Sequence, residues 1–185
     1  MKFSMKKVTV LLADGFEEIE ALTVVDLLRR AKVYVDTVSI TDDYTVRGAH
    51  GIPVQTEDLI TEIDFKESDM IVLPGGMPGT TNLKEDENVR KAVQEAYDDG
   101  RYVAAICAAP TILADMGLLK GKRATCYPDM ESEIEDAYLT GAPVATDENI
   151  ITSQGVGTAI DFAPKLIEVL ISEEKAVEIA DSIVY

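Results

Sequence analysis

Short, nearly continuous apolar runs alternate with helical patterns along this chain, and this alternation restricts the fold more than any other feature. Three of the runs lie at residues 8–13, 70–73 and 102–106. Strands of this kind are buried on both faces, as in a parallel sheet. Apolar residues at helical spacing follow these runs at residues 17–31, 86–98 and 109–116. The alternation therefore predicts an α/β fold, a three-layer sandwich around a mostly parallel sheet.

The rest of the chain fits the same architecture. We expect further strands at residues 34–40, 124–127, 144–146 and 150–152, and further helices at residues 158–171 and 173–180. The polar segment at residues 41–59 predicts a small hairpin or excursion from the sheet. No repeat or linker interrupts the pattern, so we expect a single domain over residues 1–185.

The charge balance argues against nucleic acid and against an anionic membrane surface as partners. Seventeen Lys and Arg face thirty-four Asp and Glu, which gives a net charge of −17. The apolar run at residues 8–13 ends at Asp14, too short for a signal peptide, and two cysteines are too few for a secreted disulfide scaffold. We therefore expect a cytoplasmic protein; the sequence leaves open whether translation starts at Met1 or at Met5.

Chemically distinctive residues follow three of the predicted strands. Acidic residues, including Glu17 and Glu20, come after the first strand, Gly75 and Gly76 after the third, and Cys107 after the fourth. Because chemistry collects at the carboxyl ends of parallel strands, we expect these groups to meet at one edge of the sheet.

Cys107 lies in a strand-to-helix turn with small neighbours, the pattern of a nucleophile elbow. The amino terminus of the following helix, with Pro110 in its first turn, favours the thiolate. Backbone amides of Gly75 or Gly76, together with that of Ala108, are candidates for an oxyanion hole. The alternatives are a buried structural cysteine and a glycine turn that needs positive φ.

The glutamates of the first helix differ in their expected roles. Glu17 and Glu20 share a helical stripe with core residues, whereas Glu18 is rotated away from it. An acidic first turn also simply suits the helix dipole, which is the alternative for Glu17 and Glu18. Glu20 lies deeper, so burial raises its expected pKa and suits it to be a general acid and base.

Five segments together resemble the motifs of one protein family. They are residues 12–20, 72–76, 104–110, 118–122 and 152–159. In this order they resemble the ThiJ/PfpI superfamily, in its DJ-type branch of parkinsonism-associated, deglycase-like proteins. The resemblance implies a flavodoxin-like, class I glutamine amidotransferase-like sandwich, usually a homodimer. No cofactor or metal is expected.

The resemblance also implies roles for individual residues. Cys107 is the reactive, easily oxidised cysteine, Glu20 the protonated glutamate beside it, and Gly76 and Ala108 the oxyanion-hole donors. The loop Gly155–Thr158 lies near the active site and the dimer contact. The residues expected to contact substrate are Gly75, Glu17, Tyr127 and Val156.

This chain departs from the family pattern in two places. Tyr127 stands before Pro128 where the branch often carries His, so a His-assisted step is not expected. Ala108 stands where peptidase-like members carry His, which argues against a Cys–His–acid peptidase. Two roles stay open: His50 either reaches a neighbouring subunit's pocket or has no catalytic part, and Cys126 is either a resolving thiol or a core residue.

Two functions compete at this stage. The first is a cofactor-independent glyoxalase or deglycase, a lyase or hydrolase with a cysteine nucleophile, acting on a small reactive α-oxoaldehyde through Cys107 and Glu20. The second is an oxidative-stress sensor or protective, chaperone-like protein in which Cys107 is oxidised without turnover. The sequence does not name the physiological substrate.

Overall fold

The computed structural model describes residues 5–185, so Met1, one of the two candidate start sites, lies outside the described residues. The strands are β1 (Lys7–Leu12), β2 (Tyr34–Ser39), β3 (Thr45–Arg47), β4 (Pro53–Gln55), β5 (Asp58–Leu59), β6 (Met70–Leu73), β7 (Tyr102–Ile106), β8 (Arg123–Ala124), β9 (Tyr138–Leu139), β10 (Val144–Asp147) and β11 (Ile150–Ser153). The α-helices are α1 (Glu18–Arg30), α2 (Gly79–Glu85), α3 (Glu87–Asp98), α4 (Pro110–Asp115), α5 (Ala159–Leu170) and α6 (Glu173–Ser182).

A seven-stranded sheet forms the centre of the protein, in the order β10-β11-β7-β6-β1-β2-β5. All neighbouring strands in it are parallel except the edge pair β10 and β11. The middle strands are continuously buried, as their apolar sequences require. The predicted α/β sandwich with a mostly parallel, flavodoxin-like sheet is confirmed.

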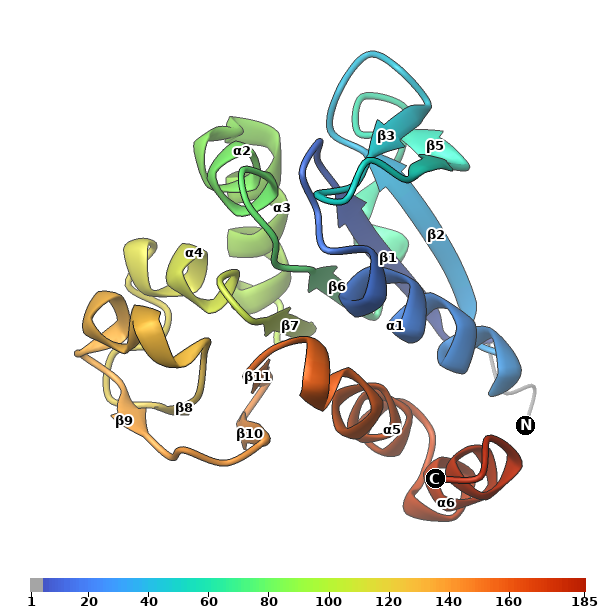
Figure 1. The fold of residues 1–185 in the computed structure, drawn as a ribbon, viewed down its shortest axis with the longest axis vertical. Helices are drawn as coiled ribbons and strands as arrows, with labels where there is room; N and C mark the ends of the chain where they lie inside the picture. Colours follow the sequence, from blue (N-terminus) through green and yellow to red (C-terminus); the bar gives the residue numbers. More distant parts are fainter. Residues whose placement is uncertain (1–4) are drawn as a thin grey trace.

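Helices cover both faces of the sheet, which gives the three layers (Figure 1). Helices α1, α5 and α6 lie on one face, and α2, α3 and α4 lie on the other. Each face has its own apolar core: Phe16 and Phe162 belong to the first, and Leu73 and Ile112 to the second. Side chains of a strand alternate between its faces, so each central strand contributes to both cores.

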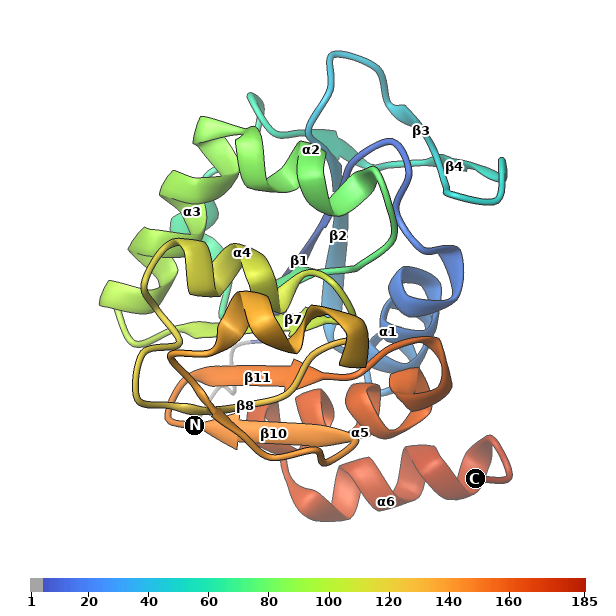
Figure 2. The same ribbon diagram turned by 60° about the vertical axis from the view of Figure 1, so that its left-hand side comes forward.

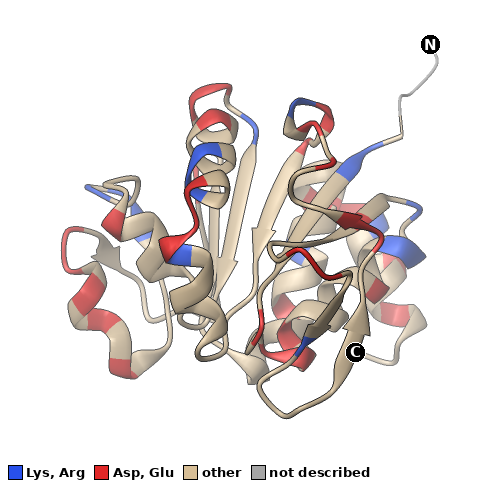
Figure 3. Ribbon diagram, turned by 90° about the horizontal axis from the view of Figure 1, so that it is seen from above, with Lys and Arg blue, Asp and Glu red and all other residues tan. Residues whose placement is uncertain are grey.

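Charged residues concentrate on the helices and loops, and the central strands are almost free of them (Figure 3). Acidic positions are spread over the surface and Lys and Arg are interspersed among them, so no basic face emerges in this view. None of the helices within residues 5–185 combines the length and the apolar character needed to cross a membrane.

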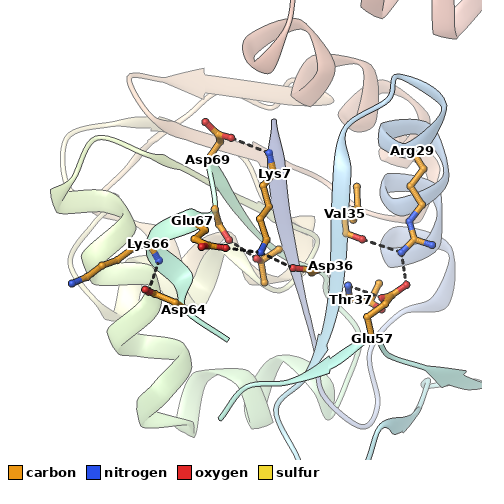
Figure 4. A network of polar contacts seen from close by, with 12 residues as sticks. Lys7, Arg29, Val35, Asp36, Thr37, Glu57, Asp64, Lys66, Glu67 and Asp69 are labelled. Atoms are coloured by element: carbon orange, nitrogen blue, oxygen red, sulfur yellow. Dashed lines mark hydrogen bonds and ion pairs between the residues drawn. The ribbon is translucent and has the colours of Figure 1, made fainter. Parts of the chain in front are cut away.

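A network of ion pairs joins the strands near their amino ends (Figure 4). The Lys7 ammonium lies 3.1 Å from the buried carboxylate of Asp36 and 3.3 Å from the exposed carboxylate of Glu67. Arg29, at the end of α1, pairs at 2.6 Å with Glu57, the residue that precedes β5. These contacts hold α1 and the edge of the sheet together at the end opposite Cys107, which follows the carboxyl end of β7.

Three local predictions need correction. Helix α2 was not expected, because its seven residues are too few to show a helical period. Of the expected strand at residues 124–127 only Ala124 lies in a strand, the two-residue β8, which pairs with β9 outside the main sheet. The excursion at residues 41–59 does contain the antiparallel pair β3–β4, which projects from the body in Figure 2, but its end forms β5 and joins the main sheet.

Candidate active site

Cys107 occupies the sharp turn between β7 and α4, with Pro110 as the first residue of the helix. Its φ is +64°, in the left-handed region that costs a non-glycine residue roughly 1–2 kcal/mol. Its amide donates to the Ser153 carbonyl at 2.9 Å, and its carbonyl accepts from the Tyr127 amide at 2.8 Å. These bonds to two other segments hold the strained turn in place, as at a nucleophile elbow.

Glu20 reaches this turn from the buried face of α1. Its side chain is fully buried, and its Oε2 accepts a hydrogen bond from the Gly75 amide at 2.9 Å. Oε1 is buried and has no hydrogen-bond partner in the described part of the chain. Burial raises the pKa of Glu20 to about 7, although interactions with Cys107 and with the Gly75 amide oppose the shift. The carboxyl group therefore titrates near neutral pH, as a general acid and base requires.

The pKa of Cys107 moves in the direction opposite to our expectation. We expected the helix amides to lower it; instead it is raised to about 12, because burial and the negative charge of Glu20 outweigh hydrogen bonds from the amides of Ala108 and Gly76. A pKa of about 12 leaves only about one thiolate in 10⁵ molecules at pH 7. The fraction of Cys107 that is thiolate therefore depends on whether Glu20 carries a proton.

The two glycines after β6 bring the backbone close to both reactive side chains. A Cβ on Gly75 would lie 2.6 Å from Glu20 Oε2 and 2.7 Å from the Cβ of Cys107. Gly76 has a φ of +90°, and a Cβ there would lie 2.4 Å from the Glu17 amide nitrogen. Both positions therefore exclude a side chain, and the amides of Gly76 and Ala108 both interact with the sulfur.

Two loops approach the Cys107 turn. Tyr127 is 44% exposed, and its amide donates to the Cys107 carbonyl. Val156 is 42% exposed and follows Gly155, where a built Cβ would lie 3.9 Å from the Cys107 sulfur. Cys126 is buried, and its thiol donates to the Tyr127 carbonyl at 3.3 Å. The structure thus places Cys126 in the core, although it does not lie on a strand.

Glu18 has a role that the sequence interpretation missed. It is only 4% exposed, and its Oε1 accepts from the His50 amide at 2.8 Å while Oε2 lies 2.8 Å from His50 Nδ1. This pairing raises the pKa of His50, with Glu17 contributing through its charge. A Cβ on Gly48 would collide with the Glu18 side chain, so that glycine makes room for it. Glu18 therefore fastens the loop after β3 to α1 and is not merely part of an acidic first turn.

Other functional contacts were also missing from the sequence interpretation. The Ser153 carbonyl holds the Cys107 amide, and the Ser153 hydroxyl lies 2.7 Å from that of Thr158. Both residues belong to the segment at residues 152–159 that carried the family resemblance. That segment was the available signal, but it gave no indication of which backbone groups face the cysteine.

Comparison with known proteins identifies the family. The model of the DJ-1/PfpI family matches residues 6–169. This chain belongs to the DJ-1/PfpI family. Among curated proteins, DJ-1 homolog B of Arabidopsis thaliana is 40% identical over the whole chain. The chain spans less than half of two Arabidopsis relatives, 42% and 45% of their lengths. The glutathione-independent glyoxalase DJ-1 of Schizosaccharomyces pombe is 33% identical over 92% of this chain and 94% of its own.

Solved structures of the DJ-1/PfpI family agree with this fold over nearly its full length. Drosophila melanogaster DJ-1beta matches with a TM-score of 0.94 and 34% identity, covering 98% of both chains. Toxoplasma gondii DJ-1, described as oxidized, matches with a TM-score of 0.93 and 36% identity, over 97% of this chain and 98% of that one. The resemblance inferred from the sequence motifs is confirmed.

Proposed function

We propose that this protein is a cofactor-independent glyoxalase or deglycase that converts small α-oxoaldehydes through Cys107 and Glu20. The observation that supports it most is a fully buried carboxyl group, with a pKa of about 7, beside an elbow cysteine and two backbone amides. The name of the S. pombe relative, a glutathione-independent glyoxalase, points to the same activity.

The nucleophile arises because Glu20 and Cys107 share one proton. Two interacting acids lose their protons in two steps that belong to the pair. The first proton leaves near pH 7, and the remaining one resides on either the carboxylate or the sulfur. The amides of Gly76 and Ala108 stabilise negative charge on the sulfur, so the reactive form is a thiolate beside a protonated Glu20.

In the reaction, the thiolate adds to the aldehyde carbon, and the new alkoxide takes the proton of Glu20 to give a hemithioacetal. The Glu20 carboxylate then removes the proton from that carbon and returns it to the neighbouring carbonyl carbon, while the hydroxyl proton of the hemithioacetal passes to the oxygen of that carbonyl. This transfer oxidises the first carbon to a thioester and reduces the second to an alcohol. Water hydrolyses the thioester, releasing a hydroxy acid and restoring the thiolate and the protonated glutamate. The amides of Gly76 and Ala108 stabilise charge that develops on oxygen.

The test is to incubate purified protein with methylglyoxal and to measure lactate. We expect turnover by the wild-type protein and its loss in Cys107→Ser, because a hydroxyl in place of the thiol is a far weaker nucleophile. Glu20→Gln should lower kcat by about 10²–10⁴-fold, the usual contribution of a general acid and base. Equal lactate formation by wild type and Cys107→Ser would refute the proposal.

A second candidate is an oxidation sensor, in which Cys107 becomes a sulfinate without turning over a substrate. Glu20, protonated at the unpaired Oε1, and the amides of Gly76 and Ala108 would donate hydrogen bonds to its oxygens. The Toxoplasma relative described as oxidized supports this possibility. Stoichiometric oxidation of Cys107 by dilute peroxide, seen by mass spectrometry in a protein without aldehyde turnover, would favour the sensor.

We also propose a homodimer of single-domain subunits in the cytoplasm. Exposed apolar side chains lie on α1, on the loop that Glu18 fastens to it, at the start of α5, which contacts α1, and in the turn just before α5; they are Ile19, Leu22, Ile52, Ile160 and Val156. Burying them against a second copy is favourable because apolar surface leaves water. Light scattering should give twice the mass of one chain, and Ile19→Glu should give monomers. A wild-type monomer would refute the dimer.

A further inference from the structure

Gly155 lies beside the sulfur of Cys107 although its backbone does not require glycine. Its φ of 164° is extended, a conformation open to any residue. A Cβ built on it would lie 3.9 Å from Cys107 Sγ and 3.7 Å from Cδ2 of the Tyr127 ring, which are ordinary contact distances. An alanine would therefore fit the resting protein, and it would occupy space between the sulfur and the tyrosine that glycine leaves open.

The walls of that space are fixed relative to the sulfur. The Gly155 amide donates to the Thr158 hydroxyl at 3.1 Å, and the Gly155 carbonyl accepts from the Thr158 amide at 2.9 Å. The same loop follows Ser153, whose carbonyl accepts from the Cys107 amide. The Tyr127 amide donates to the Cys107 carbonyl. Both segments that border this space are thus held by hydrogen bonds to the backbone of Cys107.

The proposed reaction determines what enters this space. The carbon that bonds to Sγ carries an oxygen, a hydrogen and one larger substituent. In the proposed reaction the oxygen would face the amides of Gly76 and Ala108, and the hydrogen would face Glu20, which must remove it. The direction left for the larger substituent would be past Gly155, where a built Cβ lies 3.9 Å from Sγ and 3.7 Å from the Tyr127 ring.

We infer that Gly155 is a specificity-determining residue, which leaves room beside Sγ for the acyl substituent of an α-oxoaldehyde. This inference rests on the proposed function for its substrate class. A methyl group at residue 155 competes with the substituent, because non-bonded carbon atoms pack no closer than about 3.5–4.0 Å. The loss of kcat/KM caused by this methyl group grows with the size of the substituent, from formyl in glyoxal to acetyl in methylglyoxal and benzoyl in phenylglyoxal.

The first experiment compares kcat/KM for these three substrates in wild type and Gly155→Ala. We expect the ratio of phenylglyoxal to glyoxal turnover to fall by about tenfold or more, as for one methyl group too many in a binding pocket. Gly157→Ala is the matched control, because a Cβ at Gly157 has no atom within 4 Å. Tyr127→Ala, which widens the opposite wall, should raise the same ratio. Unchanged ratios in both Gly155→Ala and Tyr127→Ala would overturn the inference.

A second experiment separates this inference from the proposed function. The rates of Cys107 alkylation by iodoacetamide and by N-benzyl-iodoacetamide measure access to Sγ without any turnover. Gly155→Ala should slow the larger reagent about tenfold relative to the smaller one. If no variant or wild type produces a hydroxy acid, the proposed function fails while this ratio still tests Gly155. If turnover occurs and neither ratio changes, Gly155 does not determine specificity and the proposed function stands.

Discussion

Replacing Glu20 by glutamine should make the protein more stable at neutral and alkaline pH. The carboxyl group is fully buried, and its pKa is raised from 4.5 to about 7, chiefly by burial. Folding therefore works against ionisation at this position. Glutamine has nearly the same shape, carries no charge at any pH, and keeps an oxygen that can accept from the Gly75 amide.

The size and the pH range of the effect follow from the shift. Below pH 4.5 the carboxyl is protonated in both folded and unfolded protein, and ionisation contributes nothing. Between pH 4.5 and 7 the unfolded chain ionises while the folded protein does not, so the wild type loses stability. A shift of about 2.5 pKa units corresponds to about 3 kcal/mol of free energy of unfolding. The wild type has lost all of this stability above pH 7.

Urea unfolding of wild type and Glu20→Gln from pH 4 to pH 8, at one protein concentration, measures this difference. We expect the free energy of unfolding of the variant, minus that of wild type, to increase by about 3 kcal/mol over this range. Glu173→Gln, which removes an exposed glutamate of α6, is the control for loss of a surface carboxylate. If the difference in the free energy of unfolding stays constant with pH, burial does not raise the pKa of Glu20.

Three further predictions follow from the same geometry. Gly75→Ala places a Cβ 2.7 Å from that of Cys107, so it should abolish lactate formation and destabilise by about 1–3 kcal/mol in urea; a fully active variant would contradict the packing. Glu18→Gln should lower the pKa of His50 toward its ordinary value in NMR titration, because it removes the main cause of the increase. Cys126→Ala should leave peroxide oxidation of Cys107 unchanged in mass spectrometry. If the oxidised wild type instead contains a Cys107–Cys126 disulfide that the variant lacks, Cys126 is a resolving thiol.

The sequence predicts those parts of the fold that depend on local patterns. The boundaries of β6 and β7 agree with the predicted runs at residues 70–73 and 102–106, because continuous apolar runs have few alternatives. The short α2 escaped prediction because seven residues contain too few apolar positions to establish a period.

The sequence predicted that Cys107 and Glu20 meet and that burial raises the pKa of Glu20, but it did not predict the direction of the Cys107 pKa shift. The positions of Cys107 and Glu20 follow from a strand-to-helix turn and a helical stripe. The direction of the Cys107 pKa shift depends on how deeply the thiol is buried and on its distance from a carboxylate far away in sequence. The loop contacts of Glu18 likewise join segments about thirty residues apart, and helical periodicity does not report them.

The shared proton is tested most directly by the rate of Cys107 alkylation as a function of pH, measured in a Cys126→Ala background. We expect a midpoint near pH 7 with Glu20 present, and a rise of about 1–2 units in Glu20→Gln, because the acidic carboxyl O–H that donates to the thiolate is replaced by the weaker N–H donor of an amide. A midpoint near 12 that falls in Glu20→Gln would mean that the carboxylate only repels the thiolate, and would contradict the account.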